Sequence, residues 1–269
     1  VQIDDGYQAE IGDWLTPSSR FASLRDTASR IRDHGRRVGI WTAPFLVSPR
    51  SVLAREHPDW LIPDVGAGTN WNVELRALDV THPDASSYLS RVFSEFRDMG
   101  IDFFKIDFIY AGALDGERHA RGVSGLEAYR QGLQLIRGAI GPGSYLLGCG
   151  APILPSVGLV DAMRVSPDVD PSYLPAGGDL CAPSQQAAAL TGRWRAWQHG
   201  RFWVNDPDCL IARLAVERRA DWAAHVERFG GLRGSSDRLR DLDGWGLATT
   251  RRLLTRVPPV PFEQDRLEG

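Results

Sequence analysis

The stretch Phe103-Phe104-Lys105-Ile106-Asp107-Phe108 decides the fold, since it is an apolar run broken only by one cation and one carboxylate. A short apolar run of this kind is typical of a buried strand in a parallel sheet. Positions i and i+2 of a strand point to the same side, so Lys105 and Asp107 are expected to share one face. The lysine would favour the ionised carboxylate, which a nucleophile requires. A buried structural ion pair is the alternative interpretation.

Similar apolar runs alternate with amphipathic helical segments on both sides of this stretch. The expected strands cover residues 1–3, 38–44, 77–80, 103–108, 145–147, 162–165 and 202–204. Helices are expected between them, one of them opened by the capping-box sequence Ser124-Gly125-Leu126-Glu127. This alternation predicts an α/β protein, a (β/α)8 TIM barrel. An eighth strand near residues 231–234 lacks a convincing apolar run.

Two further segments carry specific expectations. Residues 45–75 are rich in Pro, Gly and Asn, and they are predicted to form a long loop of the kind that is often functional. Ser184 is predicted to cap a helix whose apolar stripe carries Leu190, Trp194 and Trp197. Helices are also expected over residues 213–229 and 241–254.

The composition limits the function classes. The chain has 269 residues, a net charge of −3 and no clustered basic excess, so neither nucleic acid nor a membrane surface is an expected partner. Three cysteines without a CxxC pair indicate neither a disulfide framework nor a zinc site. A reducing compartment fits them best, and a cytoplasmic location is the expectation.

The ends of the chain suggest a piece of a longer protein. The sequence starts at Val1 and enters a strand-like run at once. The expected organisation is a catalytic barrel over residues 1–257, truncated at its start, followed by an exit or linker segment at 258–269 with Pro258, Pro259 and Pro261.

Polar side chains recur where the expected strands end. They are Asp4, Asp5, Trp41, Asp79, Lys105, Asp107, Cys149, Arg164, Asp168, Asp206 and Asp208. The carboxyl ends of barrel strands are where active sites of this fold are built. A single acid after a strand is most often a turn or capping residue, but acids after so many strands favour a shared site. Several carboxylates around one cavity suit either a divalent metal or glycoside chemistry.

The histidines weigh against metal catalysis, because hydrolytic metal sites on barrels generally recruit them beside carboxylates. None of the six histidines ends an expected strand, and no HxH or HExxH motif occurs in the sequence. The six are His34, His57, His82, His119, His199 and His225. No metal and no cofactor are therefore expected. Glycoside hydrolysis needs two carboxyl groups, for which Asp107 and Asp168 are the candidates. Taken alone, Asp168 would be a turn acid in a Pro-rich stretch.

The chain resembles glycoside hydrolase family 36, the α-galactosidases of the melibiase clan. The matching runs are Gln2-Ile3-Asp4-Asp5-Gly6-Tyr7-Gln8, Ile11-Gly12-Asp13-Trp14-Leu15, Gly39-Ile40-Trp41-Thr42-Ala43-Pro44-Phe45, His57-Pro58-Asp59-Trp60, Ala77-Leu78-Asp79, Phe104-Lys105-Ile106-Asp107-Phe108, Gly148-Cys149-Gly150, Met163-Arg164 through Pro167-Asp168, and Arg201-Phe202-Trp203 through Asn205-Asp206-Pro207-Asp208-Cys209. Each run is modest alone, but their order and spacing together are specific.

The resemblance implies roles for eight residues. Asp107 would be the nucleophile and Asp168 the general acid/base of a retaining double displacement, with the two carboxyl groups about 5–5.5 Å apart. The substrate-binding residues would be Asp4, Asp5, Trp41, Lys105, Cys149 and Arg164. The expected substrates are terminal α-D-galactosides of the melibiose and raffinose type.

The resemblance also leaves alternatives open. Family members usually carry N-terminal and C-terminal β-domains, which this sequence lacks, and oligomerise, so a homo-oligomer is the expectation for a full-length protein. The alternatives within the class are an α-N-acetylgalactosaminidase, a β-L-arabinopyranosidase and a raffinose-synthase-like transglycosidase. A non-catalytic sugar-binding barrel and a metal-dependent barrel hydrolase are the alternatives outside it, and insensitivity to EDTA would exclude the latter.

Overall fold

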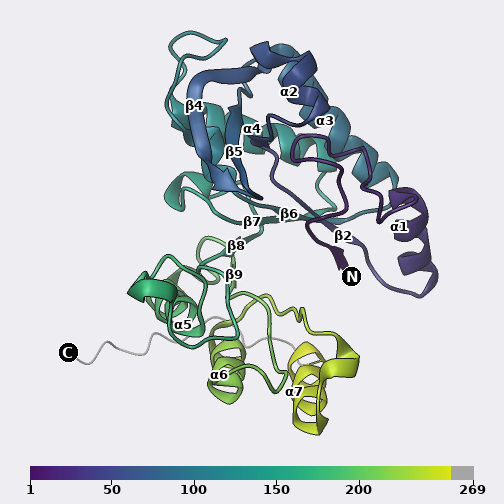
Figure 1. Ribbon diagram of the computed structural model, residues 1–269, viewed down its shortest axis with the longest axis vertical. Coiled ribbons are helices and arrows are strands. Elements are labelled where there is room, and N and C mark those ends of the chain that lie inside the picture. Colours follow the sequence, from purple (N-terminus) through teal and green to yellow (C-terminus); the bar gives the residue numbers. More distant parts are fainter. Residues whose placement is uncertain (256–269) are drawn as a thin grey trace. The chain divides into compact units, whose positions relative to one another are not determined.

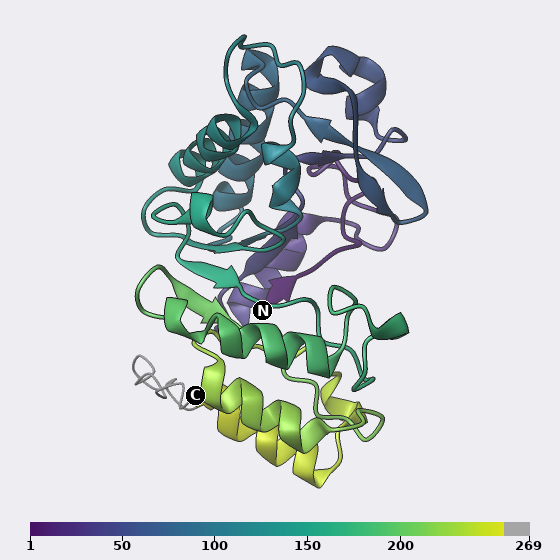
Figure 2. The ribbon, with the colours of Figure 1, turned by 90° about the vertical axis from the view of Figure 1, so that its left-hand side faces the viewer.

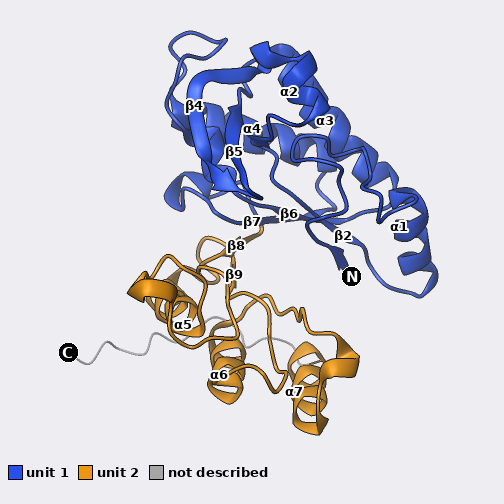
Figure 3. Ribbon diagram, viewed as in Figure 1, with its two compact units in different colours: residues 1–160 blue, residues 161–269 orange. Residues whose placement is uncertain are grey.

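The computed structural model describes residues 1–255, so the predicted linker at 258–269 lies outside the described residues. The chain divides into two compact units, Val1–Val160 (unit 1) and the residues from Asp161 onward (unit 2), as Figure 3 shows. Within the described residues, no helix has both the length and the apolar character needed to cross a membrane.

Unit 1 contains a parallel sheet whose strands follow the predicted apolar runs (Figure 1). The strands, in spatial order, are β1 (Gln2–Ile3), β2 (Gly39–Thr42), β6 (Phe103–Ile106) and β7 (Tyr145–Gly148). Trp41 on β2 lies opposite Lys105 on β6, and Lys105 lies opposite Leu147 on β7. The register therefore brings Trp41 and Lys105, and the residues that directly follow β6 and β7, to the same edge of the sheet.

Three helices of unit 1 confirm the predicted amphipathic segments. They are α1 (Leu24–Asp33), α3 (Pro83–Asp98) and α4 (Gly125–Ile140). Helix α3 buries Leu89, Val92, Phe93 and Phe96 and packs against α4. The predicted capping box begins α4, since Ser124 Oγ accepts a hydrogen bond from Glu127 N and the Glu127 carboxylate accepts one from Ser124 N. Both exchanges satisfy N–H groups that a helix start leaves without partners.

The prediction of a loop over residues 45–75 is wrong. The segment contains β3 (Leu46–Val47), α2 (Val52–Glu56), the short helix η1 (Pro58–Trp60) and β4 (Leu61–Asn70), followed by β5 (Val73–Leu78). These strands form a separate antiparallel sheet in the order β3-β5-β4, so the predicted strand at 77–80 is the end of β5 rather than a parallel strand. The pairing of β4 with β5 shifts register twice, which destroys the alternation by which strands are recognised.

Among its described residues, unit 2 has two short paired parallel strands and three α-helices. The strands are β8 (Ala162–Arg164) and β9 (Val204–Asp206), with Arg164 opposite Asp206. The helices are α5 (Gln185–Trp194), α6 (Arg219–Phe229) and α7 (Gly244–Thr255), which run side by side in Figure 2. Further short helical turns are η2 (Ile109–Ala113), η3 (Leu154–Ser156), η4 (Ala176–Gly178), η5 (Ala196–Gln198) and η6 (Leu239–Asp241).

The predicted apolar stripe of α5 is wrong. Leu190, Trp194 and Trp197 are 40%, 63% and 43% exposed. The helix buries small residues instead, including Ala187, Ala188 and Gly192. A Cβ atom added at Gly192 would lie 2.9 Å from His225 Nε2 on α6, so a small residue is what lets the two helices approach.

The end of the predicted barrel also differs from expectation. Residues 231–234 form no strand in the part of the chain that the structure describes, and the pairing nearby is one isolated parallel bridge between Leu210 and Ser235. The absence of an apolar run in this segment already indicated this outcome.

Candidate active site

Asp107 directly follows β6, and hydrogen bonds to its backbone and to its carboxylate fix where the side chain lies. The Asp107 N–H donates to the Thr42 carbonyl oxygen at 2.8 Å, which ties the residue to β2. Asp107 Oδ2 accepts a hydrogen bond from Trp41 Nε1 at 3.0 Å, and Oδ1 accepts one from Phe108 N at 2.8 Å. The side chain is 13% exposed. Two donors therefore hold a nearly buried carboxylate in one orientation.

Lys105 links the ends of β1 and β6. Its Nζ lies 3.9 Å from Asp107 Oδ2 and 3.5 Å from Asp4 Oδ2, and the Lys105 side chain is 13% exposed. The predicted proximity of Lys105 and Asp107 is confirmed. One largely desolvated cation thus stands between two carboxylates, where its attraction for anionic oxygens is less screened than in water.

Asp5 is held by two donors from different segments. Its Oδ1 accepts from Gln8 Nε2 at 2.7 Å, and its Oδ2 accepts from Trp71 Nε1 at 2.8 Å. Neighbouring Asp4 accepts through Oδ1 from the Asp5 N–H at 2.9 Å. The two adjacent acids are exposed but oriented, as residues that grip sugar hydroxyls must be.

Aromatic rings surround this group of acids. Trp41 is 2% exposed and packs edge-to-face on Trp14 and Trp71, with ring centroids 6.0 and 6.2 Å apart. Trp71 also packs edge-to-face on Phe108 at 5.5 Å. The sequence pattern does not identify Trp71, because the residue lies in the turn between β4 and β5, inside the segment predicted as a loop.

The Gly148-Cys149-Gly150 run lets the chain after β7 approach Asp107 closely. Gly150 has φ +57°, and a Cβ atom there would lie 3.0 Å from Phe108 N and 3.4 Å from Asp107 Oδ1. A side chain at this position would therefore be strained and crowded. Cys149 is 5% exposed, and its N–H donates to the Ile106 carbonyl. It fills space beside the end of β6 as a small buried side chain.

In unit 2 one guanidinium binds three carboxylates. Arg164 Nη1 lies 2.9 Å from Asp168 Oδ1, Nε lies 3.0 Å from Asp206 Oδ2, and Nη2 lies 2.9 Å from Asp208 Oδ1. The side chains of Arg164, Asp206 and Asp208 are at most 8% exposed, whereas that of Asp168 is 69% exposed. Asp168 is therefore the member of this cluster that can exchange protons with solvent or a ligand.

Asp208 also fixes the loop that carries Asp168. It accepts hydrogen bonds from Val169 N at 2.7 Å and from Cys209 N at 2.6 Å, and it has φ +84°, an uncommon conformation for a non-glycine residue. Burial, together with the charge of Asp208, raises the pKa of the Cys209 thiol to about 12. Cys209 is thus no candidate for a thiolate nucleophile at neutral pH.

The structure distributes the predicted site residues over the two units. Unit 1 gathers six of them at the carboxyl ends of its parallel strands: Asp4, Asp5, Trp41, Lys105, Asp107 and Cys149. Unit 2 carries Arg164 and Asp168 at the carboxyl end of β8. Asp206 and Asp208, noticed as strand-end acids without a role, prove to be partners of Arg164.

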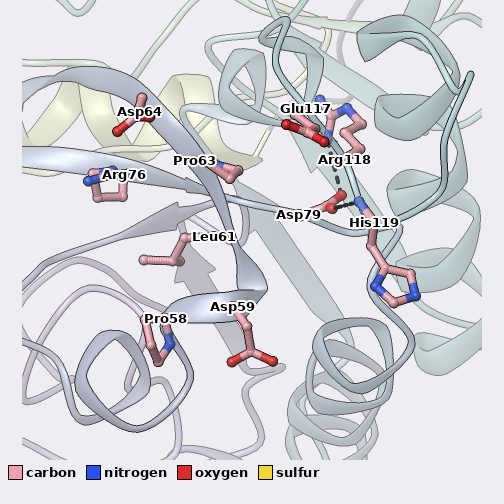
Figure 4. Close-up of a pocket in the computed structure, with 10 residues that line it drawn as sticks. All are labelled: Pro58, Asp59, Leu61, Pro63, Asp64, Arg76, Asp79, Glu117, Arg118 and His119. Carbon is pink, nitrogen blue, oxygen red and sulfur yellow. Dashed lines mark hydrogen bonds and ion pairs between the residues drawn. The ribbon is translucent and has the colours of Figure 1, made fainter.

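A pocket of about 460 Å³ elsewhere in unit 1 contains none of these residues (Figure 4). On its wall, Asp79 accepts hydrogen bonds from Arg118 Nη1 at 3.3 Å and from His119 N at 2.7 Å. Burial alone would raise the pKa of Asp79, but the hydrogen bonds from His119 and Thr81 and the charge of Arg118 outweigh it and lower that pKa. Asp79, another strand-end acid, therefore anchors a loop.

The amino-terminal part of the chain matches a known family. Residues 2–122 match the model of the Melibiase family. The chain is 29% identical over 99 residues to an α-galactosidase from Escherichia coli, and 33% identical over 114 residues to probable α-galactosidase G from Emericella nidulans. These alignments cover 34% and 35% of this chain but only 14% and 15% of the relatives, so the chain matches a small part of each.

Solved structures extend the similarity over nearly the whole chain. The α-galactosidase TtGalA from Thermus thermophilus, solved in complex with p-nitrophenyl α-D-galactopyranoside, is 34% identical with a TM-score of 0.86; the match covers 96% of this chain and 55% of that one. The fold of the family 36 α-galactosidase AgaA from Geobacillus stearothermophilus also matches, with a TM-score of 0.67 at 17% identity, covering 94% of this chain and 36% of that one. The predicted α/β barrel fold is thereby confirmed, as a partial TIM barrel. The chain therefore resembles part of the catalytic barrel of family 36 α-galactosidases, through the Melibiase match over residues 2–122 and the fold that nearly the whole chain shares with solved α-galactosidases.

Proposed function

We propose that the full-length protein carrying this chain is a retaining α-galactosidase, with Asp107 as nucleophile and Asp168 as general acid/base. The observation that carries the proposal is the Asp107 carboxylate at the end of β6, nearly buried and held by Trp41 Nε1 and Phe108 N. A nucleophile gains from such fixed orientation, because attack on an anomeric carbon requires a defined approach. The Thermus thermophilus relative, solved with a p-nitrophenyl α-galactoside and with stachyose, supports the choice of sugar.

The proposed reaction is a double displacement. Asp168 gives a proton to the glycosidic oxygen while Asp107 attacks the anomeric carbon, so that the glycosidic bond breaks and a β-linked galactosyl ester forms. Asp168 then takes a proton from water, whose oxygen attacks the same carbon and frees Asp107. Galactose leaves with its α configuration retained. The separation of about 5–5.5 Å between the two carboxyl groups, typical of retaining enzymes, stays a prediction.

The remaining acids and cations of the site support sugar binding. Asp4 and Asp5 present oriented carboxylates, which form charge-assisted hydrogen bonds to hydroxyls. Lys105 can donate to a hydroxyl beside the reacting carbon while it stabilises the ionised Asp107. In this proposal Arg164 orients Asp168, whose Oδ1 lies 2.9 Å from Arg164 Nη1.

The proposal is tested by hydrolysis of p-nitrophenyl α-D-galactopyranoside with the full-length protein and its Asp107→Ala variant. The variant should lose on the order of 10³-fold or more in kcat, because the covalent route is closed. Added azide should restore part of the rate and yield β-galactosyl azide, since the small anion occupies the space of the lost carboxylate. Asp98→Ala, at the exposed end of α3, serves as the matched control and should keep the parent rate.

Two results would contradict the assignment. An Asp107→Ala variant with parent-like turnover, or an azide product of α configuration, would remove Asp107 from the nucleophile's role. A folded but inert parent would instead direct the test to α-N-acetylgalactosaminides and β-L-arabinopyranosides. Inhibition by EDTA would favour a metal-dependent hydrolase. The cytoplasmic location and the homo-oligomer stay predictions.

A further inference from the structure

We propose that Trp71, at the tip of the β4–β5 hairpin, is a positioning residue that holds the Asp5 carboxylate ready for the sugar. The inference rests on the proposed function and adds a residue to it. Trp71 belongs to neither of the strand-end groups that the fold places at the site, and its contribution comes through Asp5 rather than through contact with the reacting atoms.

The backbone at Trp71 is the first observation. Asn70 pairs with Val73, so Trp71 and Asn72 form a two-residue turn, and both have positive φ, +49° and +57°. Turns of this type favour Asn and Gly, and a bulky residue at positive φ is destabilised by contact between its Cβ atom and the backbone. A tryptophan at the first position is therefore a poor choice for making the turn, and such outliers cluster at functional sites.

The contacts of the Trp71 side chain supply the reason for its presence. The indole Nε1 donates to Asp5 Oδ2 at 2.8 Å across 66 residues of sequence. The ring packs edge-to-face on Trp41 and on Phe108. Trp41 and Phe108 are the two residues that donate hydrogen bonds to Asp107. One side chain from the hairpin thus contacts both the residues that hold Asp107 and the acid that is proposed to bind the sugar.

The Trp71 hydrogen bond completes the fixation of Asp5. Gln8 holds Oδ1 and Trp71 holds Oδ2, so the carboxylate plane is set by both donors. A carboxylate oxygen can accept about two hydrogen bonds, so each Asp5 oxygen keeps one acceptor position for a substrate hydroxyl. Without Trp71 Nε1, an exposed carboxylate would rotate about its last side-chain bond, and binding would have to order it again.

The expected kinetic effect is a rise in KM with little change in kcat. Asp5 is proposed to grip hydroxyls that stay bound both in the substrate and in the transition state, and loss of such uniform binding raises KM alone. Because the Trp71 hydrogen bond is present in both the free and the bound protein, the effect on KM is the cost of ordering the Asp5 side chain on binding, which amounts to a change of up to roughly tenfold.

The test measures kcat and KM for p-nitrophenyl α-D-galactopyranoside in the full-length protein and four variants. Trp71→Phe keeps an aromatic ring and removes the Nε1 donor, and it should raise KM by up to roughly tenfold with kcat within about twofold. Asn72→Gly, in the same turn but without a contact to Asp5, is the matched control and should keep the parent KM. Asp5→Asn and the Trp71→Phe/Asp5→Asn double variant complete a cycle, in which Trp71→Phe should add nothing once the Asp5 carboxylate is gone.

The outcomes separate this inference from the proposed function. If the parent hydrolyses the galactoside but Trp71→Phe keeps the parent KM, or if its effect persists undiminished in Asp5→Asn, Trp71 does not act through Asp5 and the inference is wrong while the function stands. A kcat loss shared with a lowered melting temperature would mean a structural role only. If the folded parent neither hydrolyses the galactoside nor binds D-galactose in calorimetry, the proposed function fails and the inference fails with it.

Discussion

The three carboxylates around Arg164 differ mainly in exposure. The exposure of each one determines how much stability the fold should lose when that carboxylate is removed. Asp206 is 8% exposed and Asp168 is 69% exposed, although both lie about equally close to the guanidinium. Removing the charge of Asp206 takes away one of two buried counter-charges from a poorly solvated cation, whereas water replaces an exposed partner such as Asp168. Substitution of Asp206 should therefore affect mainly stability, and substitution of Asp168 mainly catalysis.

Asp206→Asn is expected to lower the stability of the fold by about 1–3 kcal/mol, because a buried charge-assisted hydrogen bond is lost. Asp168→Asn should leave the melting temperature within a degree or two of the parent, yet reduce kcat on the order of 10²-fold or more if Asp168 is the acid/base. Thermal unfolding and steady-state kinetics on the same samples check both. An equal fall in melting temperature for the two variants would contradict this reading of Arg164.

Some residues of the candidate site were predictable from the sequence and others were not, for physical reasons. Strand-end positions and the family resemblance singled out Asp107 and Asp168, because apolar runs that end in acids are local signals. The link between Arg164 and Asp206 depends on which strands pair and in what register, which a single chain's pattern does not display. Trp71 gave no signal at all, since its turn lacks the Asn-Gly sequence by which such hairpins are recognised.

At the scale of elements, periodic helices and the capping box were predictable, whereas irregular strands and small-residue interfaces were not. Helix α4 follows its local rules, as its capping box shows. Strand β4 breaks alternation through its register shifts, so only its tertiary pairing with β5 identifies it as a strand. Helix α5 buries alanines and Gly192 against α6. Its larger apolar residues are exposed, so the predicted buried face of the helix was wrong.

The α5–α6 interface holds a buried histidine with a consequence for pH. His225 is 7% exposed and stacks on Trp222 with ring centroids 5.1 Å apart. Burial, assisted by the charge of Arg193, lowers the pKa of His225 from 6.5 to about 4. The unfolded chain therefore takes up a proton first as pH falls. The stability that the neutral ring contributes is fully present above pH 6.5 and is lost progressively between pH 6.5 and 4.

His225→Leu should reduce the acid sensitivity of the fold. Linkage with the pKa of about 4 predicts that the parent loses about 2 kcal/mol through this group between pH 7 and pH 5, a loss that the leucine variant lacks. Denaturant unfolding at the two pH values measures the difference, with His34→Gln, at the exposed end of α1, as the control. A leucine variant with the parent's full pH dependence would mean that His225 is not buried in its neutral form.

For the whole molecule, the composition and the alternation of apolar strands with amphipathic helices were enough to predict an α/β barrel. Parallel strands buried under helices are apolar along their length, so this alternation recurs along the sequence. Residues 1–255 confirm the parallel strands of unit 1 and of unit 2, each with its own helices. The expected barrel over 1–257 and the flanking β-domains stay predictions. The chain accounts for 55% of the Thermus thermophilus relative, so activity is a property to be measured on the full-length protein.

Covalent trapping of the glycosyl-enzyme would identify the nucleophile directly. A fluorinated α-galactosyl fluoride, which forms the ester faster than water removes it, is incubated with the full-length protein, and the digested protein is mapped by mass spectrometry. One fluorogalactosyl group is expected, attached to the peptide that carries Asp107. A group on any other carboxylate, or turnover with β-galactose as the first product and no trapped ester, would contradict this assignment of the nucleophile.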